Sequence, residues 1–140
     1  NAGEDNASLY GKRILIAEDN ELNVEVITGL LEQIQIQVDT AANGSEAIEM
    51  FSQSQTGDYD AILMDLQMPV MDGYEATEQI RSLERDDATQ IPIIAMSADI
   101  FEESANTALE RGMDGYISKP LNNDQLFRTL KKLINREKNQ

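Results

Sequence analysis

The sequence contains no cysteine and no histidine among its 140 residues. Without cysteine, the chain has neither a disulfide framework nor a thiolate metal site. Without histidine, Ser-His-Asp hydrolysis, Cys-His catalysis, the commonest zinc sites and a role as a phosphohistidine carrier are excluded. Any chemistry of this chain must therefore use carboxylates, hydroxyl groups, lysine and the backbone.

Basic residues are also scarce, since 11 Lys and Arg stand against 26 Asp and Glu, for a net charge of −15. This balance argues against direct binding of nucleic acid, because affinity for a phosphate backbone comes largely from clustered Lys and Arg. No apolar run approaches the ~20 residues of a membrane span, and the first residues show no signal-peptide pattern. We therefore expect a cytoplasmic domain that makes no membrane contact of its own.

The length fits one domain that is large enough to fold without disulfide bonds or a structural metal. Polar residues at both ends suggest a flexible segment over 1–10, a folded domain over 11–136 and a tail over 137–140. The charged stretch 84–90 is predicted to be a solvated linker within the domain.

Short apolar segments that suit strands alternate five times with segments that suit helices. The predicted strands are 12–17, 36–41, 61–64, 91–96 and 113–118. In the first helix the apolar stripe expected to face the core is Leu22, Val26, Leu30 and Ile34, widened by Ile27 and Leu31. Such alternation predicts a doubly wound α/β domain with a parallel sheet and right-handed crossovers.

Polar side chains follow four of the predicted strands. Glu18 and Asp19 follow the first strand, Asp65 the third, Ser97 the fourth and Lys119 the fifth. The second strand alternates polar and apolar residues, which places it at the edge of the sheet. With that edge beyond the first strand, the order is 2-1-3-4-5 and the four other strands are neighbours. Their carboxyl ends then form the crevice where such sheets bind ligands.

Three carboxylates in one crevice repel one another, by about 4 kcal/mol for a pair 4 Å apart at an effective dielectric constant near 20. Lys119 supplies one compensating charge. A hard divalent cation would supply the rest, and Mg²⁺ fits best because it takes one or two carboxylates and keeps room for a phosphoryl oxygen.

The chain resembles response-regulator receiver domains over Lys12 to Arg136. The residues that carry the resemblance are Glu18-Asp19, Asp65-Leu66-Gln67-Met68-Pro69 with Asp72-Gly73, Ser97-Ala98 and Lys119-Pro120. The resemblance implies a flavodoxin-like (βα)5 fold and a phosphoacceptor function in two-component or phosphorelay signalling.

The resemblance also implies that Asp65 attacks the phosphorus of a phosphohistidine on a partner kinase and becomes an aspartyl phosphate. Asp19, Asp65 and the backbone carbonyl of Gln67 would bind Mg²⁺ directly, and Glu18 would do so through water. A carboxylate nucleophile of this kind needs positioning and charge neutralisation more than acid-base help.

Further roles are implied for residues after the last two strands. Lys119 would pair with the carboxylate and then with the phosphoryl group, Ser97 would reorient to bond a phosphoryl oxygen, and Tyr116 would rotate inward behind it. A cis peptide before Pro120 is a family feature. Two positions depart from the commoner pattern, because Asp is more usual at Glu18 and Thr at Ser97.

The stretch Ala17 to Asn23 is similar to receivers fused to the carboxyl side of hybrid sensor histidine kinases. The partners implied are the phosphohistidine domain of a histidine kinase and a histidine phosphotransfer domain. The parent kinase could be membrane-anchored, with this domain in the cytoplasm. The receiver would promote its own phosphorylation and dephosphorylation, which leaves open whether the chain counts as an enzyme.

Three alternatives remain from the sequence. One is a stand-alone regulator that works by protein contacts. Another is a phosphatase with a nucleophilic Asp, although such enzymes place a second Asp two residues later, where this chain has Gln67. The third is a docking module that is not phosphorylated, for which failure to bind Mg²⁺ would be the sign.

Overall fold

A computed structural model describes residues 7–98 and 102–136. The tail predicted at 137–140 and most of the flexible segment predicted at 1–10 lie outside the described residues.

The centre of the domain is a parallel sheet of five strands in the order β2-β1-β3-β4-β5, as predicted. The strands are β1 (Arg13–Ala17), β2 (Gln37–Ala41), β3 (Ala61–Asp65), β4 (Ile93–Ser97) and β5 (Gly115–Ser118). Every residue of β3 and β4 is buried, whereas β2 at the edge is partly exposed. This difference follows from their sequences, because strands covered on both faces are continuously apolar.

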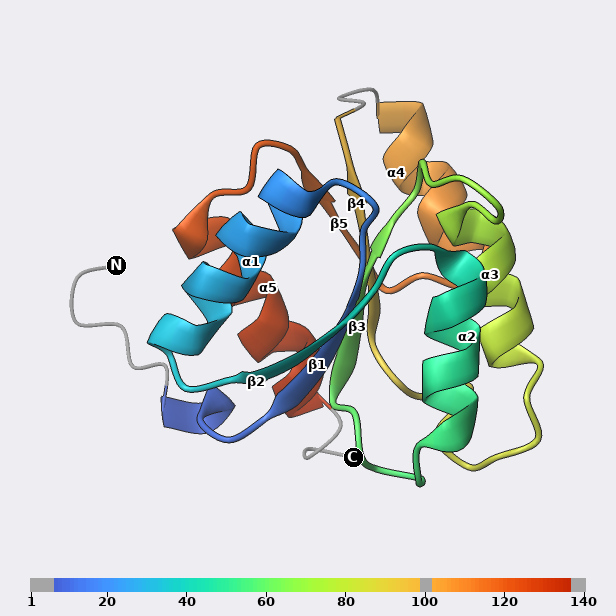
Figure 1. The fold of residues 1–140 in the computed structure, drawn as a ribbon, viewed down its shortest axis with the longest axis horizontal. Helices are drawn as coiled ribbons and strands as arrows, with labels where there is room; N and C mark the ends of the chain where they lie inside the picture. The colour runs from blue at the N-terminus through green and yellow to red at the C-terminus, as the bar shows by residue number, and fades with distance from the viewer. Residues whose placement is uncertain (1–6, 99–101, 137–140) are drawn as a thin grey trace.

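Helices cover both faces of the sheet (Figure 1). On one face lie α1 (Glu21–Gln33) and α5 (Asn123–Arg136). On the other lie α2 (Gly44–Gln53), α3 (Gly73–Arg81) and α4 (Glu102–Glu110). Two apolar cores result, one on each face. The predicted doubly wound, flavodoxin-like α/β fold is confirmed, and no described helix has the length and apolar character that crossing a bilayer requires.

The buried face of α1 matches the predicted stripe only in part. Ile27 and Leu31 are buried, and Leu30 packs against the same core. At the start of the helix, however, Leu22 is 68% exposed and Val26 is 49% exposed. Leu22 and Val26 therefore leave an apolar surface in contact with solvent.

Residues 7–9, which lie within the segment predicted to be flexible, are packed on the domain. Ala7–Leu9 forms a short 3₁₀ helix, and the side chain of Leu9 is fully buried in the core beneath α1 and α5. Complete burial of a leucine contributes about 1.5–3 kcal/mol. This anchor fixes where the chain enters the first strand.

The stretch 84–90 is only in part the solvated linker that its charges predicted, because Arg85 is held by the folded domain. The Arg85 guanidinium stacks on the Phe51 ring, donates hydrogen bonds to the carbonyls of Phe51 and Ser54, and pairs with Asp87 at 2.7 Å. Its side chain is only 13% exposed. The arginine thus joins the end of α2 to the loop before β4.

Candidate functional site

The predicted site residues lie at the carboxyl edge of the sheet, where β1, β3, β4 and β5 end side by side. A cleft at this edge brings together most of them. Its lining residues are Glu18, Asp19, Asn20, Asn23, Asp65, Gln67, Ala98 and Lys119. The convergence follows largely from the strand order, since Glu18, Asp65 and Lys119 come at or directly after the ends of their strands, whereas Asn23 comes from α1.

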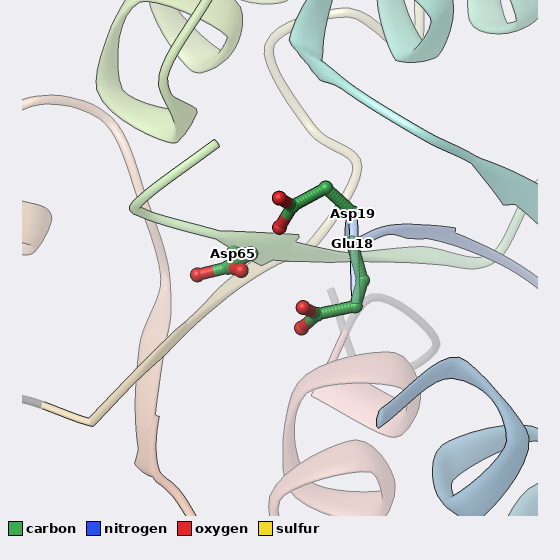
Figure 2. A group of neighbouring side chains, drawn as sticks. All are labelled: Glu18, Asp19 and Asp65. Atoms are coloured by element: carbon green, nitrogen blue, oxygen red, sulfur yellow. The ribbon is translucent and has the colours of Figure 1, made fainter. Parts of the chain in front are cut away.

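Three carboxylates meet in the cleft, with ligand oxygens of Glu18, Asp19 and Asp65 all within 4.8 Å of one another (Figure 2). Glu18 and Asp65 are buried, whereas Asp19 is exposed at the mouth. Oxygen donors with this spacing suit a hard divalent cation. The cluster could therefore hold a metal ion.

Lys119 stands between the two buried carboxylates. Its Nζ lies 2.8 Å from Oε1 of Glu18 and 3.1 Å from Oδ2 of Asp65. The pairing with Asp65 agrees with the sequence analysis, but the pairing with Glu18 was not predicted. The extra methylene of Glu relative to Asp gives the side chain at 18 a longer reach, which is the one sequence signal that could have indicated it.

Glu18 is also held from α1. Its Oε2 accepts hydrogen bonds from the backbone N–H of Asn20 at 3.2 Å and from Nδ2 of Asn23 at 3.4 Å. Asn20 is the N-cap of α1, and its side chain accepts a hydrogen bond from the Asn23 backbone N–H. Asn23 is a site residue that the sequence analysis missed, because an Asn in the first turn of a helix is ordinarily read as part of its cap.

The electrostatics of the cleft shift two pKa values. Burial, followed by the charge of Glu18, raises the pKa of Asp65 to about 6, although the Gln67 N–H and Lys119 act in the opposite direction. Burial alone would lower the pKa of Lys119, but its close pairing with Glu18 and the charge of Asp65 raise it. The Asp65 carboxylate is therefore costly to ionise in the absence of a further cation.

Ser97 and Tyr116, the predicted switch residues, lie on neighbouring strands. Ser97 is buried at the end of β4, and its carbonyl accepts a hydrogen bond from the Lys119 N–H at 2.8 Å. Tyr116 is half-buried on β5 and packs against the core beneath α2, α3 and α4. The peptide bond before Pro120 is cis, as expected. The movements predicted for Ser97 and Tyr116 stay predictions.

The loop between β3 and α3 shapes the rim of the cleft. The Gln67 N–H donates to Oδ1 of Asp65 at 3.1 Å. Further along, Val70 has φ +70° and Met71 N–H donates to the Pro69 carbonyl at 2.7 Å, which makes a γ-turn. A β-branched residue at positive φ is rare and strained, so no local pattern indicates this turn.

A mostly apolar groove adjoins the cleft on the side of α1. Its lining residues are Leu22, Asn23, Val26, Ile27, Lys119, Pro120 and Leu121. Asn23 and Lys119 line both the groove and the cleft. The exposed leucine and valine of α1 therefore lie directly beside the acidic site.

Comparison with known proteins shows several relatives. Two-component system protein A of Emericella nidulans is 45% identical over 120 residues, which cover 85% of this chain and 17% of that protein. Probable histidine kinase 6 of Oryza sativa subsp. japonica is 34% identical in an alignment 142 residues long, which covers 90% of this chain and 14% of that protein. The chain thus spans less than a fifth of the length of these relatives.

Two solved structures have the same fold. The receiver domain of a sensor histidine kinase from Pseudomonas aeruginosa PAO1, with magnesium coordinated in its active-site cleft, is 37% identical with a TM-score of 0.79, covering 89% of this chain and 98% of that one. A receiver domain from Saccharomyces cerevisiae, co-crystallised with a histidine phosphotransfer signalling protein, is 29% identical with a TM-score of 0.81, covering 92% of each chain. The family model described as response regulator receiver domain matches residues 14–131. The chain therefore belongs to the response regulator receiver domain family.

Proposed function

We propose that this domain accepts a phosphoryl group on Asp65 from a phosphohistidine of a partner protein. The observation that carries the proposal is the arrangement of Lys119 between Glu18 and Asp65, beside an exposed Asp19, at the carboxyl edge of the sheet. This arrangement places a buried carboxylate next to one fixed cation and to oxygen donors for a second.

The transfer needs no acid-base group from this chain. An Asp65 carboxylate oxygen attacks the phosphorus, the P–N bond to the imidazole breaks, and its electron pair stays on the imidazole nitrogen. That nitrogen takes up a proton as the partner leaves. The ammonium group of Lys119, already 3.1 Å from the Asp65 carboxylate, is placed to stabilise the charge on the transferred phosphoryl group.

Mg²⁺ is the proposed cofactor. Asp19, Asp65 and the backbone carbonyl of Gln67 would hold it, with Glu18 acting through water. When bound, the ion neutralises phosphoryl oxygens that the acidic cleft would otherwise repel. The magnesium in the cleft of the Pseudomonas aeruginosa receiver supports this choice.

Intact-mass measurement tests the proposal. The native chain is incubated with phosphoramidate, a small donor that also carries a P–N bond, with Mg²⁺ or with a chelator. We expect one added phosphoryl group with Mg²⁺ and none with the chelator. A folded protein that gains no mass under either condition would instead support the docking-module alternative.

The affinity for Mg²⁺ should rise with pH. Burial raises the pKa of Asp65 to about 6, and a proton on this carboxylate competes with the metal. Below pH 6 we expect the affinity to fall about tenfold per pH unit, and above pH 7 to level off. Titration calorimetry from pH 5 to 8 measures this dependence. A flat profile down to pH 5 would show that Asp65 is not a ligand.

We further propose that the domain is the receiver of a hybrid histidine kinase and exchanges its phosphoryl group with a histidine phosphotransfer domain. Relatives named as histidine kinases, and the Saccharomyces cerevisiae co-crystal structure, support this role. A cytoplasmic location belongs to the same proposal. The phosphatase alternative has no support in the comparisons, and a stand-alone regulator would share the chemistry but not the transfer partner.

The groove beside α1 is the proposed contact for the phosphotransfer partner. Leu22 and Val26 are exposed there without any role in the core, and exposed apolar side chains of this size mark protein interfaces when they border a site. The reacting imidazole of a partner seated on the groove would lie at the cleft. This contact places the partner on α1 and the loop after β5.

Leu22→Ser should slow transfer to or from a histidine phosphotransfer protein about tenfold, which corresponds to the loss of about 1.4 kcal/mol of contact with the partner. Uptake from phosphoramidate should not change, because that donor needs no groove. Leu109→Ser is the matched control, since Leu109 is a 53% exposed leucine on α4. Rapid-mixing kinetics with both donors measure the effect. A defect confined to Leu109→Ser would place the contact on α4 instead.

A further inference from the structure

The first residue of α2 makes an unusually close approach to the loop between β3 and α3. A Cβ added at Gly44 would lie 2.7 Å from the carbonyl oxygen of Met71, 2.9 Å from Cβ of Ala76 and 3.2 Å from Cβ of Met71. Its φ is not in the left-handed region, so backbone conformation does not require glycine here. Glycine is needed here only because a side chain would prevent the close contact with Met71 and Ala76.

Gly73, which follows the same loop, holds the two ends of the loop close together. A Cβ there would overlap the carbonyl oxygen of Asp65 and lie 3.0 Å from Cα of Leu66, and the Gly73 N–H donates to the Leu66 carbonyl at 3.2 Å. The loop from Leu66 to Asp72 is therefore confined between the end of β3 and the start of α2.

Confinement of this kind is what the strained turn at Val70 requires. A γ-turn with positive φ at a β-branched residue persists only where its surroundings hold it. Val70 itself is exposed and contributes little packing. Met71, the next residue, is half-buried and is the one that meets Gly44.

We propose that Gly44 is a positioning residue for the phosphoacceptor site. The close packing of α2 on Met71 holds the β3–α3 loop in the conformation that keeps Gln67 beside Asp65. The expected effect on Mg²⁺ binding rests on the proposed function, since Gln67 would supply a carbonyl ligand. The expected effect on the conformation of the loop does not depend on the proposed function.

Amide hydrogen exchange of Gly44→Ala without metal tests the loop directly. We expect exchange of the Gln67 and Gly73 N–H groups to accelerate about tenfold or more, because both hydrogen bonds depend on the loop conformation. Exchange at Leu63, inside β3, should not change. Gly29→Ala is the matched control, since an added Cβ there meets nothing within 4 Å and should alter neither loop amide.

Calorimetry with Mg²⁺ supplies a second readout. Gly44→Ala should bind Mg²⁺ about fivefold or more weakly, while Gly29→Ala binds as the native protein does. If the native protein binds no Mg²⁺, the proposed metal site fails, but the exchange result still decides the role of Gly44. The inference would be overturned if Gly44→Ala folds and its amide hydrogens at Gln67 and Gly73 exchange at the same rates as in the native protein.

A second variant covers the case in which Gly44→Ala does not fold. Asn43→Ala removes the N-cap bond to the Glu46 N–H at 2.9 Å and adds no atom against Met71. Loosening the start of α2 in this way should accelerate exchange at Gln67 and Gly73 in the same direction. Exchange rates at these two amides equal to those of the native protein would also overturn the inference.

Discussion

The Asp65→Asn protein is expected to take up no phosphoryl group from phosphoramidate or from a phosphohistidine partner. An amide is a far weaker nucleophile than a carboxylate, and the chain contains neither histidine nor cysteine to replace it. Intact mass after incubation with donor and Mg²⁺ measures the loss. Uptake retained at the native level would mean that another side chain accepts the group.

Stability provides the control that the variant is folded. The pKa of Asp65 in the folded protein is about 6, above the ordinary 3.8, so between these values the folded state binds more protons than the unfolded state. The contribution of Asp65 to stability is thus largest at low pH and falls as pH rises through 6. Without metal at pH 7.5, the free energy of unfolding of Asp65→Asn should be about 1–3 kcal/mol higher than that of the native protein. Thermal and urea unfolding measure the difference.

Lys119→Met should abolish most phosphoryl uptake and also destabilise the metal-free protein. It leaves Glu18 and Asp65 buried without their common cation. Removal of one partner from a buried ion pair costs about 3 kcal/mol or more. Urea unfolding at pH 7.5 and the rate of mass gain measure the two effects. Added Mg²⁺ should stabilise this variant more than it stabilises the native protein, because the ion replaces the lost charge.

The pH dependence and a conservative variant separate charge from geometry. The raised pKa of Lys119 means that its stabilisation is present below 10.5 and is lost only as pH rises beyond that value. The Lys119→Met defect should shrink below pH 6, where Asp65 takes up a proton. Lys119→Arg keeps the charge and should recover stability but not full uptake, since a planar guanidinium does not reproduce a compact ammonium. Native stability in Lys119→Met would contradict the ion-pair account.

The positions of Asp65 and Ser97 could be predicted from the sequence because each ends an apolar run short enough to be a buried strand. The strand order could be predicted because the second strand alternates polar and apolar residues, as an edge strand does. The ends of such runs are marked by abrupt changes in polarity, as between Met64 and Asp65. In a parallel sheet these ends meet at one edge. Local pattern was therefore sufficient to assemble most of the cleft.

Other features depend on tertiary contacts that no local pattern reports. Helical spacing predicted one wide apolar stripe on α1, and only packing against the sheet decides that Ile27 faces inward while Leu22 does not. The charge of Arg85 indicated solvent, although its guanidinium is satisfied by carbonyls that are distant in sequence. The second partner of Lys119 depends on the reach of Glu18, which only side-chain conformation determines.

The packing of Arg85 also bears on proteolysis. Trypsin must take an arginine side chain into its specificity pocket, together with an extended stretch of backbone. Here the side chain stacks on Phe51 and pairs with Asp87, so it must leave both before cleavage. A stretch that its charges mark as a digestion site is thus protected in the folded domain, and tryptic cleavage after residue 85 would report that the junction between α2 and the loop before β4 has opened.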